Sequence, residues 1–157
     1  DLDPELEINL AQAEKLIEKY ITEPATKLHS LESQIIMQAL AKYFGANTEK
    51  WGIIGLLHDI DWDLTKNDIR EHTIKSKEIL HDLCASKFLI DTIISHGYGS
   101  KECGKYPDRE RGTRIQFSLA CAETLTGLIS ASALMTKNKK VVGLELKSLI
   151  KNGIVTP

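Results

Sequence analysis

The segment Trp51-Gly-Ile-Ile-Gly-Leu-Leu-His58-Asp59 is an apolar run that ends on two ionisable side chains. A helix that is apolar on nearly every side is typical of the centre of a fold. Ionisable groups at the end of such a run are costly to bury unless something pairs with them. We therefore expect a central helix over residues 48–59, and a bound metal ion is the first hypothesis for its end.

Helical rather than alternating periodicity runs through nearly all of the remaining sequence, so we expect an all-α fold. The segment 61–68 is polar, and the segment 97–112 contains four glycines and Pro107, which suits a mobile loop. Helices are expected over residues 4–21, 27–44, 48–59, 68–83, 87–96, 113–135 and 143–151. The apolar positions of the second helix are Leu28, Leu31, Ile35, Ala39 and Phe44, which we expect to be its inward side.

Length and composition bound the organisation of the chain. With 157 residues, 42% hydrophobic and 27% charged, it suits one domain over residues 1–157 and is short for two. Its 20 basic and 22 acidic residues give a net charge of −2, so we expect neither a nucleic acid polymer nor an anionic membrane as a partner. No apolar stretch approaches the roughly 20 residues that a transmembrane helix needs. The oligomeric state stays open.

The three cysteines, Cys84, Cys103 and Cys121, are well separated and form no Cys-x-x-Cys pair. We expect reduced thiols, which favours a cytoplasmic protein. Histidines and carboxylates are therefore the candidate metal ligands.

Two histidines after the central run fall on expected inward faces. His72 lies seven residues before Ile79 in the helix expected over 68–83, and His96 lies seven residues after Leu89 in the next helix. Each alone is typical of a hydrogen-bonded core histidine. As members of an ordered set with the His-Asp pair, both are predicted to contact a metal or a substrate.

Two further residues complete the set. His29 lies on the side of its helix that carries Leu40, and Glu123 has apolar or small helical neighbours among which an unpaired carboxylate is costly. By contrast, His81 lies on a largely polar face and is taken as solvated. The candidate site residues are His29, His58, Asp59, His72, His96 and Glu123.

Imidazole and carboxylate ligands without thiolates suit a divalent transition metal, namely Mn, Fe, Co, Ni or Zn. Four imidazoles and two carboxylates exceed the needs of one structural zinc ion. Either two ions share Asp59, or one ion is bound and the remaining histidines line the pocket.

These residues resemble the HD-domain superfamily of metal-dependent phosphohydrolases, an all-helical fold named for its His-Asp pair, over about residues 28–135. The matching motifs are Lys-Leu-His29-Ser, Gly-Leu-Leu-His58-Asp59-Ile-Asp, Glu-His72-Thr, Ile-Ser-His96-Gly and Ala-Glu123-Thr-Leu-Thr-Gly-Leu-Ile. The last motif is similar to Asp-x-Leu-Thr-Gly-Leu-Ile in an uncharacterised bacterial branch of predicted HD hydrolases.

The resemblance implies a single HD-domain-like helical bundle in which His29, His58, Asp59 and Glu123 hold the primary ion. Glu123 stands where the family usually has Asp. His72 and His96 match the extra histidines of two-metal members. The implied reaction is hydrolysis of a small phosphorylated substrate, such as a nucleotide, by a metal-activated water. Asp59 would orient or deprotonate that water, and His72 or His96 would stabilise charge or donate a proton to the leaving group.

Two alternatives share this resemblance. Some two-metal members with the same ligand order are di-iron oxygenases. The other alternative is a ligand-binding HD domain in which the Glu123 substitution has impaired catalysis, since a fold does not guarantee an activity. Five basic residues could contact a phosphate but resemble ordinary solvated side chains: Lys75, Lys101, Lys105, Arg109 and Arg114.

Overall fold

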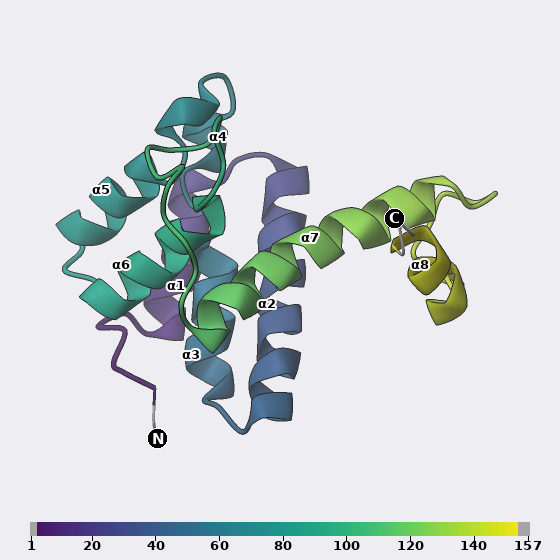
Figure 1. Cartoon of the computed structure of the whole chain (residues 1–157), viewed down its shortest axis with the longest axis horizontal. Coiled ribbons are helices and arrows are strands. Elements are labelled where there is room, and N and C mark those ends of the chain that lie inside the picture. The colour runs from purple at the N-terminus through teal and green to yellow at the C-terminus, as the bar shows by residue number, and fades with distance from the viewer. Residues whose placement is uncertain (1–2, 154–157) are drawn as a thin grey trace.

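The computed structural model describes residues 3–153, and this part of the chain forms helices and turns without a strand (Figure 1). The predicted all-α fold is therefore confirmed. The α-helices are α1 (Leu10–Tyr20), α2 (Pro24–Phe44), α3 (Thr48–Leu57), α4 (Trp62–Thr65), α5 (Ile74–Asp82), α6 (Lys87–Ile94), α7 (Arg114–Leu134) and α8 (Leu146–Gly153). Two 3-10 turns join them, η1 (Ile69–Glu71) and η2 (Ser95–Gly97).

Helix α3 lies at the centre of the bundle, as predicted. Every residue from Trp51 to Leu57 is buried, and the helix contacts α1, α2, α6 and α7. Asn47 caps its N-terminus by accepting a hydrogen bond from the backbone N–H of Lys50. His58 and Asp59 follow the last turn of α3, so they enter the space where the surrounding helices converge.

The α2–α3 contact is close because α3 presents glycines to α2. A Cβ atom on Gly55 would lie 2.6 Å from the carbonyl oxygen of Ser33 and 2.9 Å from the Cγ atom of Met37. At Gly52, the corresponding neighbour is the side chain of Gln38. At Gly55 the approach brings the two helix backbones together, which favours small side chains on the facing side of α2.

This approach explains why the expected inward side of α2 was wrong. Leu28, Leu31 and Ile35 are 56%, 42% and 64% exposed, and Ala39 and Phe44 are also exposed. The inward side instead carries mostly small residues, namely Thr26, Ser30, Ser33, Met37 and Ala41.

The first helix begins at Leu10, six residues later than expected. Asn9 and Gln12 form a capping box there, since each side chain accepts a hydrogen bond from the backbone N–H of the other residue. Before it, Leu6 and Ile8 lie buried in a non-helical segment. The capping box therefore sets the start of this helix.

The helix expected over residues 68–83 is interrupted. After η1, His72 is extended and Thr73 adopts the left-handed region with φ of 68°, before α5 begins at Ile74. The carboxylate of Asp61 accepts the backbone N–H groups of Thr73 and Ser76, and thereby caps α5 from outside the helix. His72 thus points inward because of this break and not because of helical periodicity.

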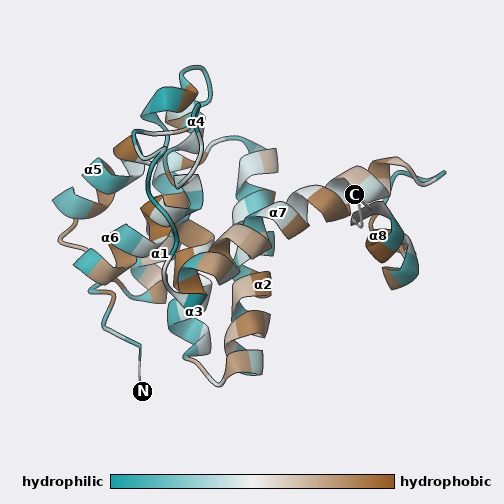
Figure 2. Ribbon diagram, in the orientation of Figure 1, coloured by the Kyte–Doolittle hydropathy of each residue, from teal (hydrophilic) through white to brown (hydrophobic). Residues whose placement is uncertain are grey.

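Helix α7 is long and apolar enough to cross a membrane by length and composition, which corrects the expectation that no segment reaches that length. Figure 2 shows it hydrophobic or neutral along most of its course. Helix α7 packs on α2, α3, α6 and η2, although only 33% of its most apolar stretch is buried. Its C-terminal end extends past the bundle toward α8 (Figure 1).

Asp63 of α4 ties the N-terminus of α2 to the segment that follows the central helix. Its carboxylate accepts hydrogen bonds from the backbone N–H groups of Thr22 (2.6 Å) and Glu23 (2.8 Å) and from the hydroxyl of Thr26 (2.8 Å). Burial opposes the charge, but these hydrogen bonds outweigh it and hold the pKa of Asp63 below its usual value. The cap fixes the first turn of α2, one turn before His29.

We predict that Gly55→Ala lowers the free energy of unfolding by about 1–3 kcal/mol, because the added methyl group meets backbone atoms that cannot move aside. Gly52→Ala is the matched control in the same buried helix. There the added group meets a flexible side chain, and we expect a change below about 1 kcal/mol. Urea unfolding of both variants measures the difference, and equal losses would contradict the backbone contact at Gly55.

We predict that Asp63→Asn destabilises the protein by about 1–2 kcal/mol at neutral pH through loss of a charged cap. Because the folded-state pKa is depressed, this contribution is present above the unfolded-state value of about 3.9 and is lost as the pH falls through the folded pKa. The unfolding free energies of wild type and variant should therefore differ at neutral pH and approach each other only as the pH falls below about 4. Asp108→Asn, at an exposed loop position, should track wild type throughout.

Candidate metal centre

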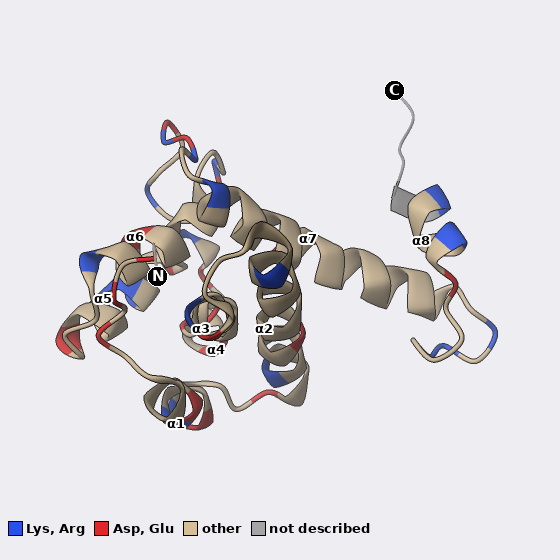
Figure 3. Ribbon diagram, turned by 90° about the horizontal axis from the view of Figure 1, so that it is seen from below, with Lys and Arg blue, Asp and Glu red and all other residues tan. Residues whose placement is uncertain are grey.

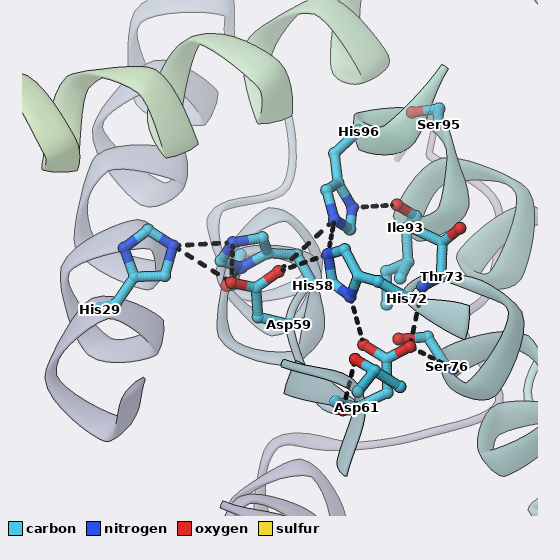
Figure 4. Close-up of polar contacts among 12 residues, drawn as sticks. His29, His58, Asp59, Asp61, His72, Thr73, Ser76, Ile93, Ser95 and His96 are labelled. Carbon is cyan, nitrogen blue, oxygen red and sulfur yellow. Dashed lines mark hydrogen bonds and ion pairs between the residues drawn. The ribbon is translucent and has the colours of Figure 1, made fainter. Parts of the chain in front are cut away.

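Asp59 lies at the centre of four histidines that come from different parts of the fold (Figure 4). His58 precedes it at the end of α3, and His29 comes from the second turn of α2. His72 comes from the break before α5, and His96 comes from η2. His58 is fully buried, and Asp59 is 9% exposed.

Each carboxylate oxygen of Asp59 faces one pair of imidazoles. Its Oδ2 atom lies 3.4 Å from Nε2 of His29 and 3.5 Å from Nε2 of His58. Its Oδ1 atom lies 3.4 Å from Nε2 of both His72 and His96. The result is two groups of three donor atoms, each within 4.8 Å of one another, that share one carboxylate.

The Nδ1 atoms of two histidines face backbone carbonyls. His58 Nδ1 lies 2.8 Å from the oxygen of Gly55, and His96 Nδ1 lies 2.6 Å from the oxygen of Ile93. A carbonyl oxygen only accepts, so each Nδ1 carries the proton that it donates. In the neutral ring, this leaves a lone pair on Nε2 of both residues.

Side chains impose the same tautomer on the other two histidines. His72 Nδ1 donates to the carboxylate of Asp61 at 2.8 Å. The hydroxyl of Thr126 donates its proton to the carbonyl of Glu123, so its oxygen accepts from His29 Nδ1 at 2.9 Å. All four histidines therefore direct an Nε2 lone pair toward Asp59 when neutral.

These lone pairs face one another at short range. Nε2 of His29 lies 3.1 Å from Nε2 of His58, and Nε2 of His72 lies 3.0 Å from Nε2 of His96. Two lone pairs at this distance repel unless a cation or a proton lies beside them. Neutral imidazole with carboxylate is a donor set for divalent transition metals, and outer partners that fix the tautomer are typical of metal-binding histidines. The residues present therefore fit a metal ion in each group.

The titration of the cluster shows where positive charge is favoured. Burial works against ionised Asp59, but His58, His96 and His72 outweigh it and hold the pKa of Asp59 far below its usual value. Burial likewise opposes a charged His72, yet hydrogen bonds to Asp59 and Asp61 raise the pKa of His72 to about 10. Burial lowers the pKa of His96 to about 4. The site thus keeps a carboxylate charged and stabilises a cation beside it.

Glu123 lies on the wall of the same cavity but outside both three-donor groups. Burial raises the pKa of its carboxyl, with His58 acting in the opposite direction. Its backbone carbonyl serves the site by holding Thr126. His81 is exposed on α5, where sequence analysis placed it outside the site.

The cavity over the cluster has a volume of about 500 Å³. Its wall includes the apolar side chains of Trp62 and Ile69, and Cys103 lies beside them. Burial raises the pKa of Cys103 to about 11, so its thiol stays protonated. None of the residues that line the cavity is a lysine or an arginine.

Two residues that orient the histidines, Asp61 and Thr126, were not predicted from the sequence. Asp61 is fully buried and accepts hydrogen bonds from His72 and from two backbone N–H groups. The same carboxylate therefore orients a histidine and caps α5. The cost of burying an unpaired charge, which singled out Asp59, applies equally two residues later in His-Asp-Ile-Asp. Thr126 offered no comparable signal, because its partner His29 is 97 positions away.

Comparison with known proteins gives one match. The family model described as HD domain matches residues 27–120, more than half of the chain and all of the donor groups. Glu123 and Thr126 lie just beyond the matched residues. No curated protein and no solved structure matches the chain.

We predict that Asp61→Asn weakens metal binding at the group of Asp59, His72 and His96 by about 10–100-fold. The amide cannot accept all of the hydrogen bonds that the carboxylate accepts, and an amide N–H₂ facing Nδ1 moves the histidine proton to Nε2. Competition with a chromophoric chelator measures each affinity. Asp82→Asn, an exposed change on α5, should bind as wild type, and unchanged affinity in Asp61→Asn would contradict this orienting role.

Proposed function

Because the chain belongs to the HD-domain family, we propose that it is a metal-dependent phosphohydrolase that acts on a small phosphorylated molecule. The observation that supports this most is the convergence of four Nε2 atoms on the two oxygens of Asp59. Members of this superfamily are generally hydrolases, and a cavity large enough for a small substrate opens directly over the cluster.

The proposed ligands are His29, His58 and Asp59 for one ion, and Asp59, His72 and His96 for the other. Divalent transition metals held there would supply Lewis acidity to a phosphoryl oxygen and would lower the pKa of a bound water toward about 7. Asp59 stays ionised at neutral pH, so it can hold both groups together and accept a hydrogen bond from the attacking water.

Glu123 takes a separate role in this proposal. In a two-ion site the Nε2 atoms of His72 and His96 are ligands, so neither histidine is free to donate a proton to the leaving group. The partly buried Glu123 carboxyl lies on the cavity wall, and burial raises its pKa above the usual value. We assign it proton donation to the leaving-group oxygen.

The wall of the cavity narrows the substrate class. No lysine or arginine is among the described residues that line the cavity, although Arg111, which donates a hydrogen bond to the backbone oxygen of His96, lies close enough to act on the charge of Glu123. The ions would neutralise one phosphoryl group, while Trp62 and Ile69 offer apolar surface to the remainder. We therefore propose a phosphomonoester with an uncharged organic part, and none of the five basic residues considered from sequence lines this cavity.

We predict that the protein binds two divalent ions per chain and hydrolyses at least one phosphomonoester, and that Asp59→Ala loses both ions and the activity. Mass spectrometry of metal content, with a screen of phosphomonoesters and nucleoside di- and triphosphates under Mn, Fe, Co, Ni and Zn, measures this. His81→Ala, an exposed histidine on α5, is the matched control and should keep both properties.

Three outcomes would count against the proposal. Absence of turnover under every metal would favour a ligand-binding domain, and a gain of activity in Glu123→Asp would then identify an impaired enzyme. Turnover that needs reductant and dioxygen, with two irons and a coupled paramagnetic signal, would assign the di-iron oxygenase class. Full activity in Glu123→Gln would remove Glu123 as the proton donor.

A further inference from the structure

Charge is unevenly distributed along the chain. We call residues 134–151, from the end of α7 through α8, the C-terminal arm. The arm contains a single acidic residue, Glu145, and its formal charge is +4, which leaves −6 for the rest of a chain whose total is −2. Figure 3 shows these basic residues gathered around α8 and the preceding loop. The arm's five lysines are Lys137, Lys139, Lys140, Lys147 and Lys151.

The arm also exposes large apolar side chains. Met135 and Val142 are 77% and 83% exposed, which is unusual for side chains of this type. Scattered apolar residues are normal on a surface, but here they share one short segment with the lysines. The exposed apolar residues of the arm are Leu134, Met135, Val141, Val142, Leu146 and Ile150.

Helix α8 is amphipathic, and its apolar side is only partly covered. Leu149 is partly buried, whereas Leu146 and Ile150 are 70% and 50% exposed. Glu145, Ser148 and Lys151 line a groove beside the end of α7, and helical spacing puts Leu146 and Ile150 on the side away from Ser148. An amphipathic helix normally turns its apolar side to the core, so this one leaves much of that side exposed.

We propose that the C-terminal arm binds the surface of an anionic lipid bilayer. Exposed apolar side chains beside several lysines combine the two contributions that hold an interfacial helix, burial at the acyl boundary and attraction to anionic headgroups. Two arms packed face to face would instead bring +4 against +4, which disfavours a second copy as the occupant. The proposal departs from the expectation of no membrane partner, which rested on the charge of the whole chain.

The test is cosedimentation of the full chain with vesicles of phosphatidylcholine alone or with about 30% phosphatidylserine. We expect binding to the anionic vesicles only, weakening as salt is raised. Lys137→Glu/Lys139→Glu/Lys140→Glu should lower the partition coefficient by at least about ten-fold. Lys15→Glu/Lys42→Glu/Lys77→Glu changes the net charge equally at exposed positions outside the arm and should bind as wild type.

A second variant tests the apolar contribution. Leu146→Ser/Ile150→Ser should reduce vesicle binding at least about ten-fold while leaving the melting temperature unchanged, because both side chains are exposed. Equal binding to neutral vesicles, or no binding to either kind, would overturn the proposal. Self-association in sedimentation velocity that this variant abolishes would also overturn it and assign the arm to a second copy of the chain.

Discussion

The absence of a polar side on α3 is the constraint on which the rest of the structure depends. Every residue of its apolar run is buried, so other helices must pack around it. The residues that follow its last turn therefore enter the buried centre of the bundle. A carboxylate in that position is tolerated only if positive or polarisable partners surround it. Asp59 therefore accounts for the gathering of imidazoles from four segments, and the same desolvation that makes its charge costly strengthens its attraction for a cation.

Asp61 connects this electrostatic centre to the backbone around it. Thr73 is a β-branched residue in the left-handed region, a conformation that costs about 1–3 kcal/mol and persists only where its surroundings impose it. The Asp61 carboxylate holds the Thr73 N–H while its other oxygen holds the His72 ring. Close packing of Gly97 and Gly104 against Thr73 confines the same segment. The orientation of one histidine and the backbone strain beside it are thus maintained together.

Most of what the sequence did not predict depends on contacts between two segments. The central helix and the His58-Asp59 pair follow from one apolar run, and the structure confirms that helix. His72 was selected for the wrong reason, because a left-handed residue and not a helical face turns it inward. The inward side of α2 was wrong because the close approach at Gly55 selects small residues over Leu28 and Leu31. A single domain, a cytoplasmic location and the roles of the ligands stay predictions.

The pairing of His29 with Thr126 has a consequence for the order in which the molecule folds. The two residues are 97 positions apart. Closing a loop of this length costs conformational entropy, and the hydrogen bond can form only after the loop has closed. The segments that carry the other three histidines lie between them and meet through shorter connections. The imidazole of His29 therefore has its orienting partner only once α7 has packed beside α2, so a complete donor set requires both helices to be in place.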